Sequence, residues 1–237
     1  DPTKGLTGGK FVGFKYFLDF FHNPLFGEIM TNTIRISLWT LVMGFIFPII
    51  LALLINQIGS KKIKGFVQTI TYMPHFISVV VIVSMLNIFL TPGTGILGRF
   101  FGDESLMGST SAITAVYWIS EVWQHVGWNS IIYLAALAGV DTSLYEAAKI
   151  DGANWWQIFT KITMPYMMFV MTPNLITTFT GNINNFNVIY LLTNGAPACD
   201  TYYRGTAGKT DLLVTWLYKL TIDNKDYNLG AVIGILS

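Results

Sequence analysis

Four long intervals of this chain contain almost no Asp, Glu, Lys or Arg. Residues 36–60 and 65–98 contain none, residues 105–140 contain only Glu121, and residues 162–199 again contain none. A charge at the centre of a bilayer costs at least about 2.5 kcal/mol, and an α-helix needs about 20 residues to cross the apolar core. Each interval is therefore long enough to span a membrane, whereas a fifth apolar stretch, residues 228–237, is too short. We expect an all-α, polytopic transmembrane helical bundle.

The composition agrees with a membrane protein and excludes other classes. Charged residues make up 11% of the 237 residues, against about 25% in soluble domains, and hydrophobic residues make up 52%. A net charge of +1 provides no basic surface for nucleic acid, and a single cysteine, Cys199, excludes a disulfide framework or a cysteine-rich metal site. No His, Cys and carboxylate cluster has metal-ligand spacing, so we expect no cofactor or metal on this chain. Nothing in the pattern indicates a role for Cys199.

The positions of the lysines predict which loops face the cytoplasm, because cytoplasmic loops are enriched in Lys and Arg. Residues 61–64 include three lysines, and the loop two spans later, residues 141–165, includes two more. We place both loops inside the cell and residues 91–110 and 193–227 outside. This topology predicts six spans in the parent chain, with the first and part of the last lying beyond this sequence.

The inner loop at residues 141–165 is too long and too patterned for a simple connection. Ser143 followed by Glu146 predicts a capping box, and Gly152 predicts the end of a short helix and a turn into a second one. Trp155, Ile158, Phe159 and Ile162 recur at helical spacing and predict an apolar face. Such a face is typical either of an amphipathic helix lying in the membrane interface or of a docking element for a cytoplasmic partner.

Several residues of this loop carry a resemblance to a known family. Glu146, Ala147 and Ala148 are followed by Gly152, and then by Ile162 and Pro165 with Met164 where leucine is usual. This pattern resembles the EAA motif in permease subunits of bacterial binding-protein-dependent ABC importers. Residues 184–186, 191–197 and 210–214 are similar to the larger membrane subunit of the maltose importer, apart from Ala196 where glycine is common. Residues 13–78 resemble permeases of oligosaccharide and polysaccharide importers.

The resemblance implies a type I ABC importer permease fold, with residues 1–237 forming a single transmembrane permease domain in the bacterial cytoplasmic membrane. It implies a second permease subunit, a dimer of ATP-binding subunits, an extracytoplasmic solute-binding protein and the lipid bilayer as partners. ATP and Mg would bind the ATPase subunits and not this chain. The residues implied to couple this chain to the ATPase are Glu146, Ala147, Ala148, Asp151, Gly152, Ile162 and Pro165.

Polar residues are concentrated in the fourth uncharged interval. Thr178, Asn182 and Asn185 are spaced i, i+4 and i+7, which places them on one face of a helix. Their hydroxyl and carboxamide groups both donate and accept hydrogen bonds, as sugar hydroxyls require, and the resemblance implies a sugar site at these positions. The alternative is that they form hydrogen bonds between helices. Asn184 and Asn187, off this face, are expected to serve helix packing.

The third interval adds a second polar cluster. Its candidate substrate residues are Glu121, Gln124, His125 and Trp128, and His75 in the second interval is a candidate of the same kind. Aromatic faces stack on sugar rings, and Gln and His side chains can hydrogen-bond to hydroxyls. The alternative is a local ion pair between Glu121 and His125 near the outer membrane interface, with the tryptophans forming an aromatic belt.

This chain is not expected to be an enzyme. Residues 205–210 imitate the end of a P-loop, but Tyr203 stands where the motif needs glycine, and no serine lies in a nucleophile elbow. We expect a permease that moves an oligosaccharide or polysaccharide fragment by alternating access, driven by ATP hydrolysed on another subunit. The alternatives are another cargo (a sugar derivative, a polyol phosphate or an acidic polysaccharide), an ion-coupled secondary transporter that uses Glu121, and an intramembrane enzyme.

Overall fold

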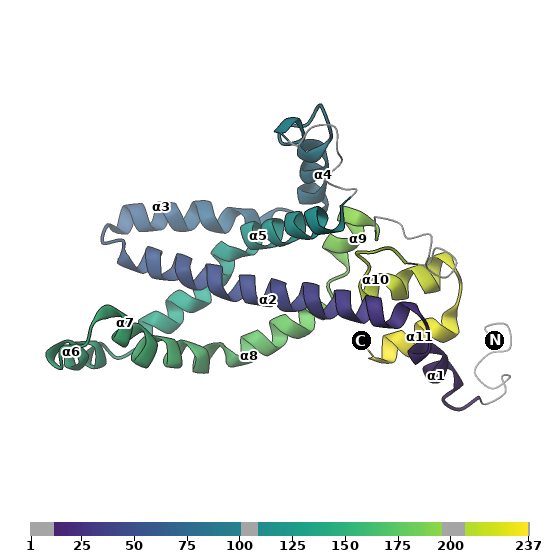
Figure 1. The fold of residues 1–237 in the computed structure, drawn as a ribbon. Coiled ribbons are helices and arrows are strands. Elements are labelled where there is room, and N and C mark those ends of the chain that lie inside the picture. Colours follow the sequence, from purple (N-terminus) through teal and green to yellow (C-terminus); the bar gives the residue numbers. More distant parts are fainter. Residues whose placement is uncertain (1–11, 101–108, 196–206, 237) are drawn as a thin grey trace.

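The computed structural model describes residues 12–100, 109–195 and 207–236. All regular elements in these ranges are helical, in agreement with the expected all-α class (Figure 1). The helices are α1 (Lys15–Phe21), α2 (Leu25–Gln57), α3 (Lys61–Tyr72), α4 (Val79–Leu90), α5 (Thr110–Ala138), α6 (Thr142–Ile150), α7 (Trp155–Ile158), α8 (Met164–Ile183), α9 (Asn187–Thr193), α10 (Leu213–Tyr218) and α11 (Tyr227–Leu236). Cys199, Ala196 and Tyr203 lie outside the described residues.

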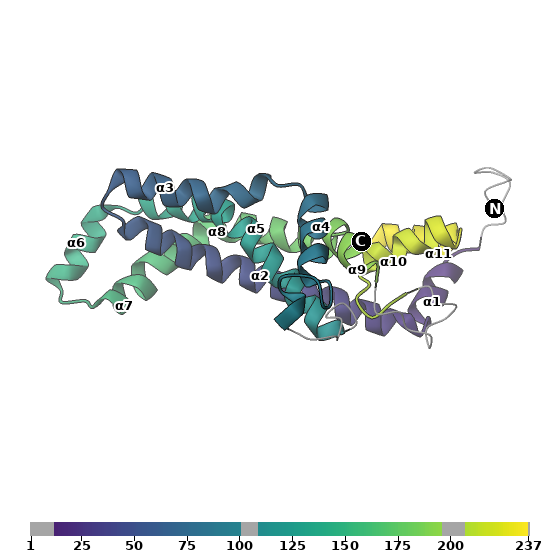
Figure 2. The same ribbon diagram turned by 90° about the horizontal axis from the view of Figure 1, so that it is seen from above.

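Helices α2, α3, α5 and α8 run along the length of an elongated bundle, and α2 packs against both α5 and α8 (Figure 1). The α2–α3 connection lies at the same end as α6 and α7, while α1, α10 and α11 lie at the other end (Figures 1 and 2). The two lysine-bearing loops therefore share one end of the molecule, as the expected topology requires. From here on, the α6–α7 end is called the inner end and the α10–α11 end the outer end.

Three clusters of buried apolar residues lie along the bundle. The outer cluster includes Phe20, Leu25, Trp216 and Ile233, the middle one Ile36, Val83, Tyr117 and Ile189, and the inner one Ala52, Tyr133, Met167 and Met171. Helix α2 contributes to all three clusters, so it connects the two ends. Large apolar side chains on the outside of the bundle stay exposed, among them Ile119, Phe169 and Ile176. Exposure of this kind suits a surface that faces lipid.

The second uncharged interval does not form one straight span, contrary to our expectation. A 3-10 turn at Met73–Phe76 follows α3, and α4 then leaves at an angle of 93°. Pro74 supplies no backbone N–H in this turn, and Ser78 caps α4 by accepting a hydrogen bond from the Val81 N–H at 3.4 Å. Hydropathy does not reveal such a break, because both halves are apolar.

The expected spans differ in length and in hydropathy. Among the described helices, α2 alone is long and apolar enough, and the number rises to three if each of two bent pairs counts as one span. One pair is α3 with α4, and the other is α5 with α6, bent by 66°. Helix α8 has 20 residues but is not among the candidates, because its Asn and Thr residues lower its hydropathy. Helix α11, with 10 residues, is as short as expected.

The inner loop has the helix–turn–helix form expected of it, with one correction. Gly152 takes a φ of +74° between α6 and α7, so the predicted turn at this glycine is confirmed. The predicted capping box at Ser143 and Glu146 is wrong, because Asp141 caps α6 and accepts a hydrogen bond from the Ser143 N–H at 2.9 Å. Asp is as good an N-cap as Ser and comes two residues earlier, so Ser143 falls inside the helix.

Candidate functional site

A cavity of about 320 Å³ opens between α2, α5 and α8 in the middle of the bundle. Its polar lining consists of Thr40, Glu121, His125, Asn129, Thr178, Asn182, Asn185 and Asn187, together with the indole of Trp118. The cavity therefore presents carboxamides, hydroxyls, one carboxyl group and one imidazole, and no Lys or Arg is among the described residues that line it. Such a set of donors and acceptors can bind a polyhydroxylated molecule without a counter-ion.

Five of the eight expected substrate residues line this one cavity: Glu121, His125, Thr178, Asn182 and Asn185. Helix α8 ends at Ile183, so Thr178 and Asn182 share a helical face, but Asn185 lies in the break between α8 and α9. The break turns Asn185 back toward α5, where its Nδ2 donates to the Tyr117 Oη at 3.1 Å. The three residues thus meet at the cavity, although they do not continue one helix.

Two of these asparagines also link helices, which was the alternative interpretation. Asn182 Nδ2 donates to the Ser37 carbonyl oxygen of α2 at 3.4 Å, and Asn185 forms a further side-chain hydrogen bond with Glu121. Asn187 was expected to serve packing, and it also lines the cavity. Asn184 is exposed, lies outside the lining and donates to the Thr180 carbonyl oxygen at 3.3 Å.

Glu121 and His125 form the local pair that the sequence offered as an alternative. His125 Nδ1 lies 3.5 Å from the Glu121 Oε2 and 3.1 Å from the Glu121 carbonyl oxygen. Both side chains line the cavity, so the pair and a contact with cargo are compatible. Within the described ranges, no group of three or more His, Cys, Asp or Glu side chains is arranged to hold a metal ion.

The other three expected substrate residues, Gln124, Trp128 and His75, are not among the residues that line the cavity. Gln124 is buried, and its Nε2 donates to the Ile77 carbonyl oxygen at 3.1 Å, at the break between α3 and α4. His75 stacks on Trp128 with ring centroids 4.5 Å apart and planes 4° apart. The geometry therefore gives all three a role in supporting the bend.

Three further residues of the polar lining were not predicted from the sequence. Thr40 and Asn129 are polar residues inside uncharged intervals, so the criterion used for the fourth interval would have found them. Trp118 gave no signal, because a tryptophan in an apolar helix is ordinary. In the described part of the chain its Nε1 is buried without a hydrogen-bond partner.

The expected ATPase-coupling residues divide between the inner tip and the base of α8. Glu146, Ala147, Asp151 and Gly152 are exposed on or beside α6, and Ala148 is half-buried. Ile150 is 85% exposed beside them, and Trp155 and Trp156 are 59% and 62% exposed on α7. Ile162 lies in a π-helical turn, Phe159–Thr163, and Pro165 lies in the first turn of α8. The tip therefore presents an apolar surface that this chain does not cover.

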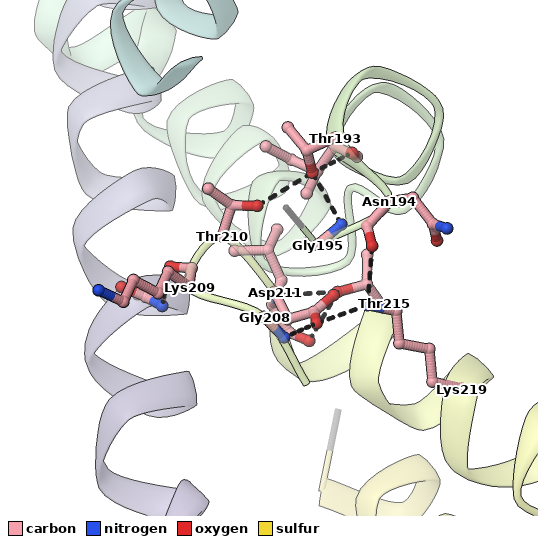
Figure 3. A network of polar contacts seen from close by, with 12 residues as sticks. Thr193, Asn194, Gly195, Gly208, Lys209, Thr210, Asp211, Thr215 and Lys219 are labelled. Atoms are coloured by element: carbon pink, nitrogen blue, oxygen red, sulfur yellow. Dashed lines mark hydrogen bonds and ion pairs between the residues drawn. The ribbon is translucent and has the colours of Figure 1, made fainter. Parts of the chain in front are cut away.

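A buried polar network at the outer end was not expected from the sequence (Figure 3). Asp211 is fully buried and accepts hydrogen bonds from the Gly208 N–H at 2.6 Å, the Thr215 hydroxyl at 2.8 Å and the Lys219 ammonium group at 2.7 Å. Lys219 also donates to the Asn194 carbonyl oxygen at 2.9 Å. These contacts join the end of α9 to the turn before α10.

Helix α2 is attached to the same network. The Asn32 Nδ2 donates to the Lys209 carbonyl oxygen at 2.8 Å, and the Thr33 hydroxyl accepts a hydrogen bond from the Leu213 N–H at 2.9 Å. A polar groove of about 560 Å³ lies beside this junction and is lined by Glu28, Asn32, Arg35 and Lys209, among others. These contacts attach residues 209–213 to α2 beside a polar groove.

Comparisons with known proteins agree with this architecture. Residues 44–236 match the family model described as "Binding-protein-dependent transport system inner membrane component". Protein LplB of Bacillus subtilis (strain 168) is 32% identical over 240 residues, which cover 99% of this chain and 73% of LplB. The polygalacturonan/rhamnogalacturonan transport system permease protein YteP of the same organism is 36% identical over 212 residues, which cover 85% of this chain and 66% of YteP.

A solved structure shows the same fold. A chain in the crystal structure of a bacterial ABC transporter that imports the acidic polysaccharide alginate is 31% identical, with a TM-score of 0.77 over 95% of this chain and 78% of that chain. The helical permease fold and the resemblance drawn from the EAA-like motif are therefore confirmed. This chain belongs to the family of inner membrane components of binding-protein-dependent transport systems.

Proposed function

We propose that the chain is one of two permease subunits of an ATP-driven importer that carries an oligosaccharide or polysaccharide fragment across the bacterial cytoplasmic membrane by alternating access. The observation that carries the proposal is the polar cavity between α2, α5 and α8, lined by hydroxyl and carboxamide groups inside an otherwise apolar bundle. Polar groups at membrane depth mark a solute path by default. The transport roles of YteP and of the alginate importer support a saccharide cargo.

The lining also bears on which saccharide is carried. The described residues supply a carboxyl group, Glu121, and no Lys or Arg to the cavity. An acidic cargo would need a cation from the second permease subunit, whereas a neutral oligosaccharide would not.

The test replaces single side chains of the cavity in the assembled transporter. Asn182→Ala removes a carboxamide from the lining, and Asn184→Ala removes an exposed one from outside it. An uncharged hydrogen bond is worth about 0.5–1.5 kcal/mol, so uptake of labelled oligosaccharide by the Asn182 variant should fall roughly 2- to 10-fold. Equal uptake by the two variants would argue against this cavity as the route.

The exposed inner tip is the proposed docking site for the ATP-binding subunits. Its acidic residue Glu146 and the exposed Ile150 and Trp156 offer a charge and an apolar surface to a cytoplasmic partner. Glu146→Lys should reduce co-purification of the ATPase subunit, while Asp19→Lys, the same kind of change at the outer end, should not. Full recovery of the ATPase with the Glu146 variant would contradict the docking role.

The groove at the outer end is the proposed contact for the extracytoplasmic solute-binding protein. A second crystal structure of a bacterial alginate importer captures that transporter in complex with a periplasmic protein bound to an alginate pentasaccharide. In this chain Arg35 and Lys209 offer two cations at the groove. Lys209→Glu should weaken binding of the solute-binding protein, and Lys225→Glu, an exposed change beyond the groove, serves as the control.

A further inference from the structure

Helix α6 is joined to the rest of the bundle by very little packing. None of its residues is buried, and it lies between a 66° bend after α5 and the turn at Gly152. A short helix between two bends can pivot when a partner pushes on it. To transmit a displacement, it must therefore be tied to the membrane helices by some other contact.

The first such tie is a hydrogen bond between Tyr145 and Thr163. The Tyr145 Oη and the Thr163 Oγ1 are 3.1 Å apart, although the residues are 18 positions apart in the chain. Thr163 is 5% exposed and is the last residue of the π-helical turn that leads directly into α8. Among the described residues, this is the only hydrogen bond from an α6 side chain to another element. It connects the exposed helix to the buried base of α8.

The second tie joins the base of α8 to the end of α5. The Tyr166 Oη donates to the Gly139 carbonyl oxygen at 3.2 Å across 27 positions of the chain. A Cβ at Gly139 would lie 2.9 Å from this hydroxyl, so the glycine leaves room for the contact. With both ties in place, the base of α8 is connected to α6 through Tyr145 and to the end of α5 through Tyr166.

Helices α5 and α8 carry opposite parts of the cavity lining. Glu121 and His125 come from α5, and Thr178 and Asn182 come from α8. Thr178 lies 15 residues beyond Thr163, which is about 22 Å along a helix. A displacement of α6 that reaches the bases of both helices would therefore move both sides of the cavity.

We infer that Tyr145 and Tyr166 are positioning residues that tie the ATPase-coupling helix α6 to the bases of α5 and α8, so that its displacement reaches the cavity. The inference rests on the proposed docking of the ATPase at α6. It assigns the transmission to two phenolic hydroxyl groups and not to the turn at Gly152 or to the exposed apolar tip.

The test removes each hydroxyl while the ring is kept. Tyr145→Phe and Tyr166→Phe are introduced into the complex with its second permease, ATPase subunits and solute-binding protein in liposomes, and transport and ATP hydrolysis are measured together. Each variant should carry roughly 2- to 10-fold less cargo per ATP hydrolysed, the factor expected for one uncharged hydrogen bond. Tyr227→Phe, at an exposed tyrosine of the outer end, should leave this ratio unchanged.

A second set of variants separates the hydrogen bond from general packing. Thr163→Val removes the other hydrogen-bond partner and should lower the cargo carried per ATP to the same extent as Tyr145→Phe. Thr163→Ser keeps a hydroxyl and should retain the wild-type ratio. The double variant Tyr145→Phe with Thr163→Val should be no worse than either single variant. Unchanged cargo per ATP in Tyr145→Phe would overturn the inference, as would a loss that merely parallels lower thermal stability. If the wild-type complex still transports cargo and binds the ATPase, only the inference fails and the proposed function is retained. A wild-type chain that recruits no ATPase would refute the proposed function itself.

Discussion

The ion pair between Asp211 and Lys219 provides the sharpest test of how the outer end is stabilised. Asp211 is fully buried, and the Lys219 side chain is 13% exposed at an N–O distance of 2.7 Å. Lys219→Met keeps most of the side-chain volume but leaves the carboxylate with only the Gly208 N–H and the Thr215 hydroxyl. Removing one member of a buried pair typically costs about 3–5 kcal/mol, because the other charge stays buried.

The cost is measured by thermal unfolding of the detergent-solubilised complex. A chain of this size loses about 2–4 °C in Tm per kcal/mol, so Lys219→Met should lower the Tm by roughly 6–20 °C. The control Lys225→Met changes an exposed lysine nearby and should stay within about 0.5 kcal/mol of the wild type. The double variant Asp211→Asn with Lys219→Met should lose less than the sum of the single variants, because a neutral side chain needs no counter-charge. A Lys219→Met protein as stable as the wild type would refute this reasoning.

Three further outcomes follow from the packing. Gly127→Ala should cost about 1–3 kcal/mol in thermal unfolding, because the new Cβ would overlap the Thr71 carbonyl of α3. Gly195→Ala should lower the Tm, since this glycine has a φ of +81° and a Cβ would overlap the Asp211 carboxylate. The Ser143 N–H holds the pKa of Asp141 below its ordinary value, so this cap stabilises α6 above about pH 4 and is lost as the pH falls through the lowered value. Amide exchange in α6, corrected for intrinsic rates, should therefore rise in acid for the wild type but not for Asp141→Asn.

Much of the candidate site could be predicted from residue types and their spacing in the sequence. Thr178 and Asn182 were predicted from their i, i+4 spacing, and a helix does place them on one face of the cavity. The position of Asn187 in the cavity lining was not predicted, because the helix on which its position was counted ends at Ile183. Periodicity applies only within one helix, and the break that follows α8 depends on contacts with α5 that are distant in sequence.

Gln124, which is not in the cavity lining, shows a second limit of prediction from the sequence. Gln124 was expected to contact substrate, but its amide satisfies the Ile77 carbonyl at the break between α3 and α4. A polar residue in an apolar helix is equally typical of a solute path and of a support for irregular backbone. The choice between these roles depends on which backbone groups a neighbouring helix leaves without partners, and the sequence of one helix does not contain that information.

The amino-acid sequence by itself determined the membrane class, the ends of the bundle at which the loops lie and the helix–turn–helix form of the inner loop. These features follow from local physics: the cost of charges in lipid, the bias of lysines and the backbone freedom of Gly152. Tertiary structure alone decided the 93° break, the cavity shared by Glu121 and Asn182, and the buried pair of Asp211 and Lys219. The break and the cavity depend on contacts between residues far apart in the chain, such as Gln124 with the Ile77 carbonyl. The members of the buried pair are 8 positions apart, but their burial depends on how the helices pack and not on any local pattern.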